Sequence, residues 1–190
     1  MLVAMGLDRI EAIRAKFAAI VEREMRPFGF EAHQLRLLPT AKEEDVMAFE
    51  ELYGLSLPED YRAFLLGVGS GGAGPGYGLV PFDVSPTYER TAFPPEAVAA
   101  PFPFTEAKLI ESEQSSEEVR DLSGTLVLSD EGCGYLHLLI VSGEARGQVW
   151  VDATVSDVGV FPIAPTFSDW YERWLDNLLV GGDGCWWLNE

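Results

Sequence analysis

The chain has 190 residues, of which 47% are hydrophobic and 12% aromatic, and this composition excludes an intrinsically disordered protein. Its formal net charge of −18 is large for this length and repels nucleic acid and anionic membrane surfaces, so we expect no direct binding to either. The same charge attracts basic partners, although it also serves solubility alone, and both roles stay open.

The first predicted element is an amphipathic helix over residues 7–26. Its apolar residues recur at three- and four-residue spacing with charged residues between them, beginning with Leu7, Ile10 and Ile13. Pro27 and the glycine that follows end the helix.

A second helix is predicted to begin near Thr40. Thr40 and Glu43 have the form of a capping box, in which each side chain accepts a backbone N–H of the first turn. Phe49 lies on the apolar face of this helix, and Gly54 can adopt the left-handed conformation that ends it. Pro58 has a φ angle suited to the first turn of a third helix, so two helices meet at a corner.

Residues 67–78 are too rich in glycine for regular structure, and they predict a loop that leads into a strand near Leu79–Val84. A phosphate-binding loop would need the pattern G-x-x-x-x-G-K-[ST]. No lysine or arginine lies between Arg62 and Arg90 to neutralise a phosphate, so a nucleotide site is disfavoured.

The stretch after this loop is punctuated by prolines and is predicted to run irregularly over the surface of the sheet. Phe93, Phe102 and Phe104 would hold it there. An acidic segment follows that contains Glu117 and Glu118, and we interpret it as a solvated loop or short helix.

Four strands are predicted after Gly124, over residues 125–129, 135–141, 149–153 and 158–163, because apolar and β-branched residues recur there. Short links between consecutive strands imply antiparallel pairing. The strand over 135–141 is apolar on both faces, so we place it centrally, with helices on at least one face of the sheet.

A last helix is predicted from about Phe167 to Leu179, with an inward face of Trp170, Trp174, Leu175 and Leu178. Together the elements predict one α+β domain over residues 1–190. Its sheet is mixed or mainly antiparallel and is flanked by helices.

A specific motif spans the corner between the second and third helices. Its residues are Phe49-Glu50, Gly54, Leu57-Pro58, Asp60-Tyr61, Phe64-Leu65 and Gly71-Gly72. This order resembles the SMI1/KNR4 family, also called the SUKH superfamily, whose mark is an F-E-x-x-x-G-x-x-L-P-x-D-Y-x-x-F-L segment before a glycine-rich turn. Looser agreement extends the resemblance over residues 38–179.

The resemblance implies an α+β fold and a non-enzymatic protein-binding domain. Bacterial proteins of this kind are similar to immunity proteins that bind and neutralise toxins, many of them basic nucleases, and the acidity of this chain suits a basic toxin domain. The alternative is a regulatory or scaffold module that binds a housekeeping protein.

No catalytic site can be assembled from the sequence. His137 lies in an apolar strand and is interpreted as a core residue, and neither His137 nor His33 supports a catalytic triad. Ser70 and Ser129 lack the context of a nucleophile elbow. The chain is therefore predicted not to be an enzyme.

The cysteines and the N-terminal sequence indicate the cellular compartment in which the protein is expected. Cys133 and Cys185 form no C-x-x-C pair and, with two distant histidines, predict no metal site, so we interpret them as free thiols. The N-terminus lacks a basic start followed by an apolar run, and no run of about 18 apolar residues occurs. We expect a cytoplasmic protein without a cofactor.

Partner binding is predicted for acidic turns and for two adjacent tryptophans. The acidic turns are expected to gather at one end of the sheet, where turn formation is the ordinary interpretation and cation binding an alternative. The tryptophans either pack back on the domain, which is favoured, or enter a partner. The predicted residues are Glu117, Glu118, Asp130, Glu131, Asp152, Asp157, Trp186 and Trp187.

Overall fold

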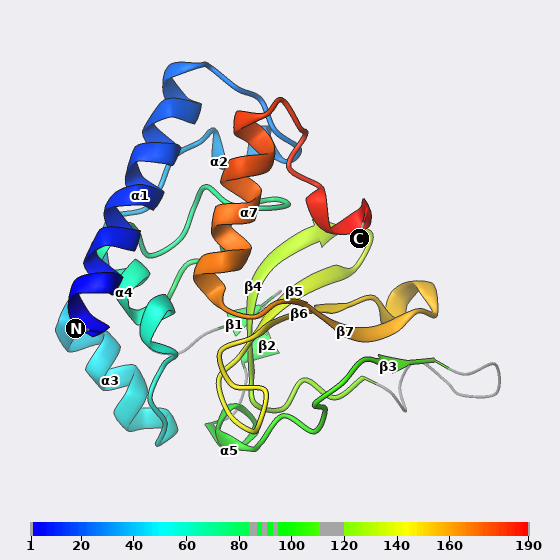
Figure 1. Ribbon diagram of the computed structural model, residues 1–190. Helices are drawn as coiled ribbons and strands as arrows, with labels where there is room; N and C mark the ends of the chain where they lie inside the picture. Colours follow the sequence, from blue (N-terminus) through cyan, green and yellow to red (C-terminus); the bar gives the residue numbers. More distant parts are fainter. Residues whose placement is uncertain (1, 84–86, 89–90, 93–94, 111–119, 190) are drawn as a thin grey trace.

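The computed structural model describes residues 2–83, 87–88, 91–92, 95–110 and 120–189, and Figure 1 shows their arrangement. A five-stranded antiparallel sheet is covered on one face by the helices α1 (Leu2–Glu22), α4 (Glu59–Gly67) and α7 (Phe167–Leu179). The predicted α+β class is confirmed. Among the described residues, no helix is long and apolar enough to cross a membrane.

Helices α1 and α7 lie side by side and are joined by ion pairs (Figure 1). Arg9 pairs with Asp169 and Glu172, and Lys16 Nζ lies 2.8 Å from carboxylate oxygens of both Glu172 and Asp176. Burial alone would raise the pKa of Glu172, but hydrogen bonds from the two cations hold that pKa below its ordinary value. The predicted helix is confirmed, although it begins before residue 7 and ends at Glu22.

The helix α3 (Glu43–Tyr53) ends at Gly54, which has the expected left-handed conformation with φ of 62°. The structure also explains the glutamate of the motif. Glu50 Oε1 accepts a hydrogen bond from the backbone N–H of Leu57 at 2.9 Å, so this carboxylate fixes the loop between α3 and α4. The guanidinium of Arg146 donates to the carbonyl oxygen of Leu57 at 2.9 Å.

The predicted capping box is wrong. Lys42 occupies the N-cap position of α3, no side chain caps the helix there, and Thr40 is exposed. The approach to the helix is set instead by tertiary pairing, because the N–H of Ala41 donates to the carbonyl oxygen of Leu65 at 2.9 Å. Helix α4 begins one residue later than predicted, with Pro58 at its N-cap.

The remaining motif residues join α4 to α7. Asp60 Oδ2 accepts a hydrogen bond from the backbone N–H of Ser168 at 2.7 Å, which satisfies a free donor in the first turn of α7. Tyr61 and Phe64 are buried, and both rings pack on Phe167, with centroids 4.8 and 4.9 Å away. The corner motif therefore builds the helical layer.

The glycine-rich loop is confirmed over residues 68–78, since Gly67 is the last residue of α4. The strand predicted near Leu79–Val84 is wrong for residues 79–83, and Val84 lies outside the described residues. Leu79 makes only isolated bridges, to Gly72 and to Ser129. Pro81 follows two residues later and has no N–H to continue a ladder.

The sheet contains five strands in the order β3-β7-β6-β5-β4, and every neighbouring pair is antiparallel. Their bounds are β3 (Lys108–Leu109), β4 (Thr125–Gly132), β5 (Tyr135–Ile140), β6 (Val149–Asp152) and β7 (Gly159–Ala164). The four predicted strands are confirmed. The middle strand is β6 rather than β5, which lies next to the edge strand β4.

Both faces of the sheet are buried, as the two apolar faces of β5 predicted. On one face, Leu139 packs into the main core with Trp170 and Trp174 of α7. On the other face, Leu138 and Trp150 lie in a second core with Phe102. Phe104 packs against that second core, so the predicted role of these two phenylalanines is confirmed, while Phe93 lies outside the described residues.

The short elements complete the fold. They are α2 (Phe30–His33), β1 (Thr87–Tyr88), β2 (Thr91–Ala92), α5 (Pro95–Ala99), and the 3-10 turns η1 (Thr154–Ser156) and η2 (Trp186–Asn189). The stretch predicted to be irregular thus contains a paired β1–β2 and a short helix. Helix α7 matches its prediction at both ends, and its four predicted inward side chains are fully buried.

Candidate functional site

Two of the predicted site residues, Asp130 and Glu131, lie at the end of β4, next to the turn that leads into β5. Gly132, Cys133 and Gly134 all have positive φ and form a tight turn. Asp130 Oδ1 accepts a hydrogen bond from the backbone N–H of Gly132 at 2.7 Å, which is the turn-forming role expected of this aspartate. Asp130 is half-buried, whereas Cys133 is exposed at the tip.

Glu131 is buried, and it belongs to a polar cluster beneath the turn. Ser129 Oγ donates to Glu131 Oε1 at 2.7 Å, and His137 Nδ1 lies 3.1 Å from the same oxygen. Trp187 Nε1 donates to Glu131 Oε2 at 3.2 Å, and Trp170 Nε1 donates to His137 Nδ1 at 3.2 Å. The cluster connects β4, β5, α7 and η2.

Serine, histidine and glutamate are the residue types of a hydrolytic triad, but this geometry differs from one. In a triad, the nucleophile and the carboxylate bond to opposite nitrogens of the imidazole. Here Ser129 Oγ and Glu131 Oε1 both lie near His137 Nδ1, at 3.3 and 3.1 Å. Ser129 and His137 have no exposed surface, so this cluster joins the C-terminal segment to the sheet and presents no nucleophile to solvent.

The environment of Glu131 favours its ionised form. Burial raises its pKa, but the nearby His137 imidazole and the hydrogen bonds from Ser129 and Trp187 lower it, and the net pKa lies below the ordinary glutamate value. The nearby Cys185 thiol has its pKa raised to about 11 by burial and by the charges of Asp183 and Glu131. Both cysteines are free thiols, as predicted.

We expect the stabilising contribution of ionised Glu131 to be lost in acid. Because its folded pKa lies below the ordinary value of 4.5, the unfolded state binds more protons, and the free energy of unfolding falls as the pH drops through and below 4.5. Urea denaturation of the protein and of Glu131→Gln between about pH 7 and 3 measures this: the stability difference should shrink below about pH 4.5. A difference that stays constant across this range would contradict the lowered pKa. Glu144→Gln, at an exposed glutamate, controls for loss of a surface charge.

The two C-terminal tryptophans pack back on the domain, as favoured. Trp186 and Trp187 are each 8% exposed and belong to the main core. Arg173 of α7 lies over the Trp186 ring, 5.3 Å from its centroid, and the Trp187 ring lies 5.1 Å from that of His137. Neither side chain is available to a partner in this conformation.

The predicted acids of the neighbouring turn have two different environments. Asp152 is buried, and its carboxylate accepts hydrogen bonds from Arg120 Nε at 2.8 Å and from Thr154 Oγ1 at 2.6 Å. Asp157 is exposed after η1. The turns are adjacent, because Tyr135 Oη donates to Ser156 Oγ at 2.7 Å. Glu117 and Glu118 lie outside the described residues.

The acidic turns therefore meet at one end of the sheet, but their carboxylates do not form one open surface: Asp157 is exposed and Asp130 half-exposed, while Glu131 and Asp152 are buried. Within the part of the chain that the structure describes, no group of three or more histidine, cysteine or acidic side chains could hold a metal ion.

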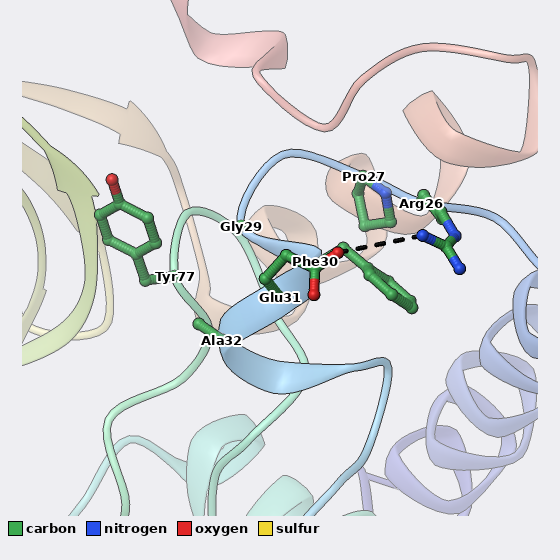
Figure 2. A pocket seen from close by; sticks show the side chains of 7 residues that line it. All are labelled: Arg26, Pro27, Gly29, Phe30, Glu31, Ala32 and Tyr77. Carbon is green, nitrogen blue, oxygen red and sulfur yellow. Dashed lines mark ion pairs between the residues drawn. The ribbon is translucent and has the colours of Figure 1, made fainter.

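A cleft lies beside the β4–β5 turn and was not predicted. It has a volume of about 480 Å³ and is lined by Arg26, Pro27, Gly29, Phe30, Glu31, Ala32 and Tyr77. Figure 2 shows Tyr77 apart from Arg26 and Glu31, with its ring directed away from them. The backbone N–H of Tyr77 donates to the carbonyl oxygen of Asp130 at 2.8 Å, which fixes the glycine-rich loop against the turn.

The cleft is flanked by exposed aromatic side chains. Phe28 is 40% exposed and Tyr77 is 50% exposed, and their ring centroids are 5.5 Å apart. A signal was present in the sequence, since Phe28 and Phe30 flank Gly29 directly after the first helix. It could not be interpreted alone, because the pairing of Phe28 with Tyr77 joins segments far apart in the chain.

Comparison with known proteins gave one finding. A family model described as SMI1 / KNR4 family (SUKH-1) matches residues 40–173. Searches of curated proteins and of solved structures gave no match. The matched range includes the corner motif, the whole sheet and the first half of α7.

Proposed function

The chain belongs to the SMI1/KNR4 family (SUKH-1), and from this membership we propose that it is an immunity protein that binds and neutralises a cognate bacterial toxin. The family includes immunity proteins, and its domains generally bind proteins rather than catalyse reactions. The observation that carries the proposal is the family match over residues 40–173.

Charge supports a basic toxin domain as the partner. A net charge of −18 raises the association rate of a basic protein, and this steering weakens as salt screens the charges. A regulatory module for a housekeeping protein remains the alternative, and it would not require a basic partner.

We place the contact at the end of the sheet, on a surface that we call the hairpin-end surface. It comprises Phe28, Tyr77, Asp130, Cys133 and Asp157, which are exposed or half-exposed around the β4–β5 turn. The four buried residues that we predicted as contacts, Glu131, Asp152, Trp186 and Trp187, would act indirectly by fixing this end of the fold. Glu117 and Glu118, which lie outside the described residues, stay predicted contacts of the partner.

The test is binding kinetics with the toxin domain encoded beside this protein, if one is encoded there. We expect a complex whose association rate falls as salt rises from about 50 to 500 mM, since the screening length falls from about 14 Å to about 4 Å over this range. Asp157→Lys should slow association. Glu11→Lys, at an exposed acid of α1, makes the same change in net charge and should slow it less. Figure 1 shows α1 apart from the turn between β4 and β5.

Two results would count against the proposal. Failure of the toxin domain to bind, or to lose its activity in the presence of the protein, would contradict the immunity function. An association rate that is independent of salt and of the Asp157 charge would contradict electrostatic steering at the hairpin-end surface.

A further inference from the structure

Three exposed aliphatic side chains lie on adjacent segments at the end of the sheet, and we call them the aliphatic strip. Leu109 of β3 and Val155 of η1 are each 56% exposed, and Val158, in the same turn as Val155, is 42% exposed. The N–H of Ile110 donates to the carbonyl oxygen of Val158 at 3.0 Å. Leu109 pairs with Gly159, the residue after Val158, so β3 and this turn are in direct contact.

The aliphatic strip is continuous with the hairpin-end surface. Val155 packs over Gly134 of the β4–β5 turn, because a Cβ atom added to that glycine would lie between 3.1 and 3.3 Å from the Val155 side chain. Gly134 directly follows Cys133 of the hairpin-end surface. Asp157, another residue of that surface, lies between Val155 and Val158 in the chain. The aliphatic and acidic side chains therefore belong to one surface.

The turn that carries the two valines is held in place by hydrogen bonds. Asp152 Oδ1 accepts from the backbone N–H of Thr154 at 3.0 Å and from Thr154 Oγ1 at 2.6 Å. The N–H of Asp157 donates to the carbonyl oxygen of Thr154 at 3.1 Å, and Asp157 ends η1 in the left-handed conformation with φ of 56°. Exposed side chains on a fixed backbone lose little conformational freedom on binding, which favours their use as interface anchors.

Charge indicates what covers this surface. Asp157 is exposed, and among the residues that the structure describes no side chain pairs with its carboxylate, whereas Asp152 is bonded to Arg120 Nε at 2.8 Å. A partner that covered the valines with apolar atoms alone would bury the Asp157 carboxylate without a counter-charge, which is costly. A second copy of this chain fits poorly, because it brings a further net charge of −18 and a second Asp157.

We infer that the aliphatic strip is the apolar centre of the partner interface and that Asp157 belongs to its charged rim. The partner is a protein surface with an apolar centre and a lysine or arginine at its edge, which pairs with Asp157. The inference rests on the proposed function for the identity of that partner. In such interfaces the rim charges mainly set the association rate, and the buried apolar contacts mainly set the dissociation rate.

The first test measures binding kinetics with the toxin domain that is encoded beside this protein. Val155→Thr and Val158→Thr keep the branched shape and replace one methyl group by a hydroxyl group. We expect each to raise the dissociation rate at least about fivefold and to leave the association rate within about twofold. Asp157→Asn should instead lower the association rate, by about twofold or more at low salt. Val21→Thr, at a 44% exposed valine of α1, makes the same chemical change away from the strip and should alter neither rate.

The second test needs no toxin domain and uses small probes on the labelled protein, followed by NMR chemical shifts. Isoamylammonium carries a branched aliphatic group and a cation, whereas isoamyl alcohol lacks the charge and ethylammonium lacks most of the aliphatic group. We expect isoamylammonium to shift the signals of Val155, Asp157 and Val158 saturably, with at least about threefold higher affinity than either control. Val158→Thr should weaken its binding.

Three results would overturn the inference. One is a toxin complex in which the strip variants and Val21→Thr dissociate at the same rate. Another is equal binding of the three probes, or shifts spread evenly over the exposed acids. The third is a dimer of the protein alone that Val158→Thr dissociates in sedimentation, because a second copy would then cover the strip. All these substitutions lie at exposed positions, and a thermal melt of each variant checks that it is folded.

The two tests separate this inference from the proposed function. If the toxin domain binds and is neutralised but the strip variants dissociate at the unaltered rate, the inference fails while the immunity function stands. If isoamylammonium binds the strip selectively and no toxin domain binds, the strip remains the contact for another basic partner and the immunity function fails.

Discussion

Replacing Phe64 with alanine is expected to lower the free energy of unfolding by about 3–5 kcal/mol. Phe64 is fully buried, and its ring packs edge-on against Phe167 and Tyr171, with centroids 4.9 and 4.8 Å away. The substitution removes the free energy gained by burying the aromatic ring. It also leaves a cavity between α4 and α7, which the rigid neighbouring side chains cannot fill. Urea denaturation of both proteins measures the difference.

A matched control comes from the adjacent helix. Met47 of α3 is 57% exposed, so Met47→Ala should change the free energy of unfolding by about 0.5 kcal/mol or less. Since native domains are stable by only about 5–15 kcal/mol, the Phe64 variant is expected to be marginally folded. Equal midpoints for the two variants would show that Phe64 does not join α4 to α7.

Replacing Glu131 with alanine is expected to cost about 2–6 kcal/mol, a loss similar to that for Phe64, because two buried donors lose their acceptor at about 1–3 kcal/mol each. The substitution leaves the N–H of Trp187 and the hydroxyl of Ser129 without their acceptor in a buried place. The C-terminal turn η2 should loosen from the sheet, because Glu131 is the sheet residue that accepts a hydrogen bond from Trp187.

Two measurements test the prediction for Glu131→Ala. Urea denaturation gives the loss of stability, and the tryptophan fluorescence spectrum of the folded variant reports exposure of Trp187. Glu144→Ala, at an exposed glutamate, should leave both unchanged within about 0.5 kcal/mol. If Glu131→Ala is as stable as that control, the buried cluster does not hold the C-terminus.

The sequence predicted the position of elements better than the partners of individual side chains. Helix α7 was predicted correctly at both ends because its inward tryptophans and leucines repeat at helical spacing. The capping box failed although its local pattern was correct. Ala41 pairs with Leu65, and that contact between distant segments fixes the backbone before α3, so the threonine never reaches the N-cap.

The carboxylates at the sheet end also show that the sequence does not predict the partners of individual side chains. Adjacent antiparallel strands brought Asp130 and Asp152 to neighbouring turns, as the order of elements required. Alternation along a strand cannot show that Glu131 and Asp152 are buried, because that depends on what covers the sheet. Trp187 covers Glu131 from the C-terminus, and Arg120 binds Asp152 from the segment after the acidic stretch.

By itself, the sequence determined the α+β class, the antiparallel strands and the corner motif, and the corner motif indicated the family. These features depend on the periodicity of apolar residues and on turn residues, which act over a few positions of the chain. Only the tertiary structure decided which acids face solvent, that Ser129, Glu131 and His137 form a closed cluster, and that Phe28 meets Tyr77 beside a cleft. These arrangements join residues tens of positions apart or on different strands, and the packing of the whole chain sets their distances.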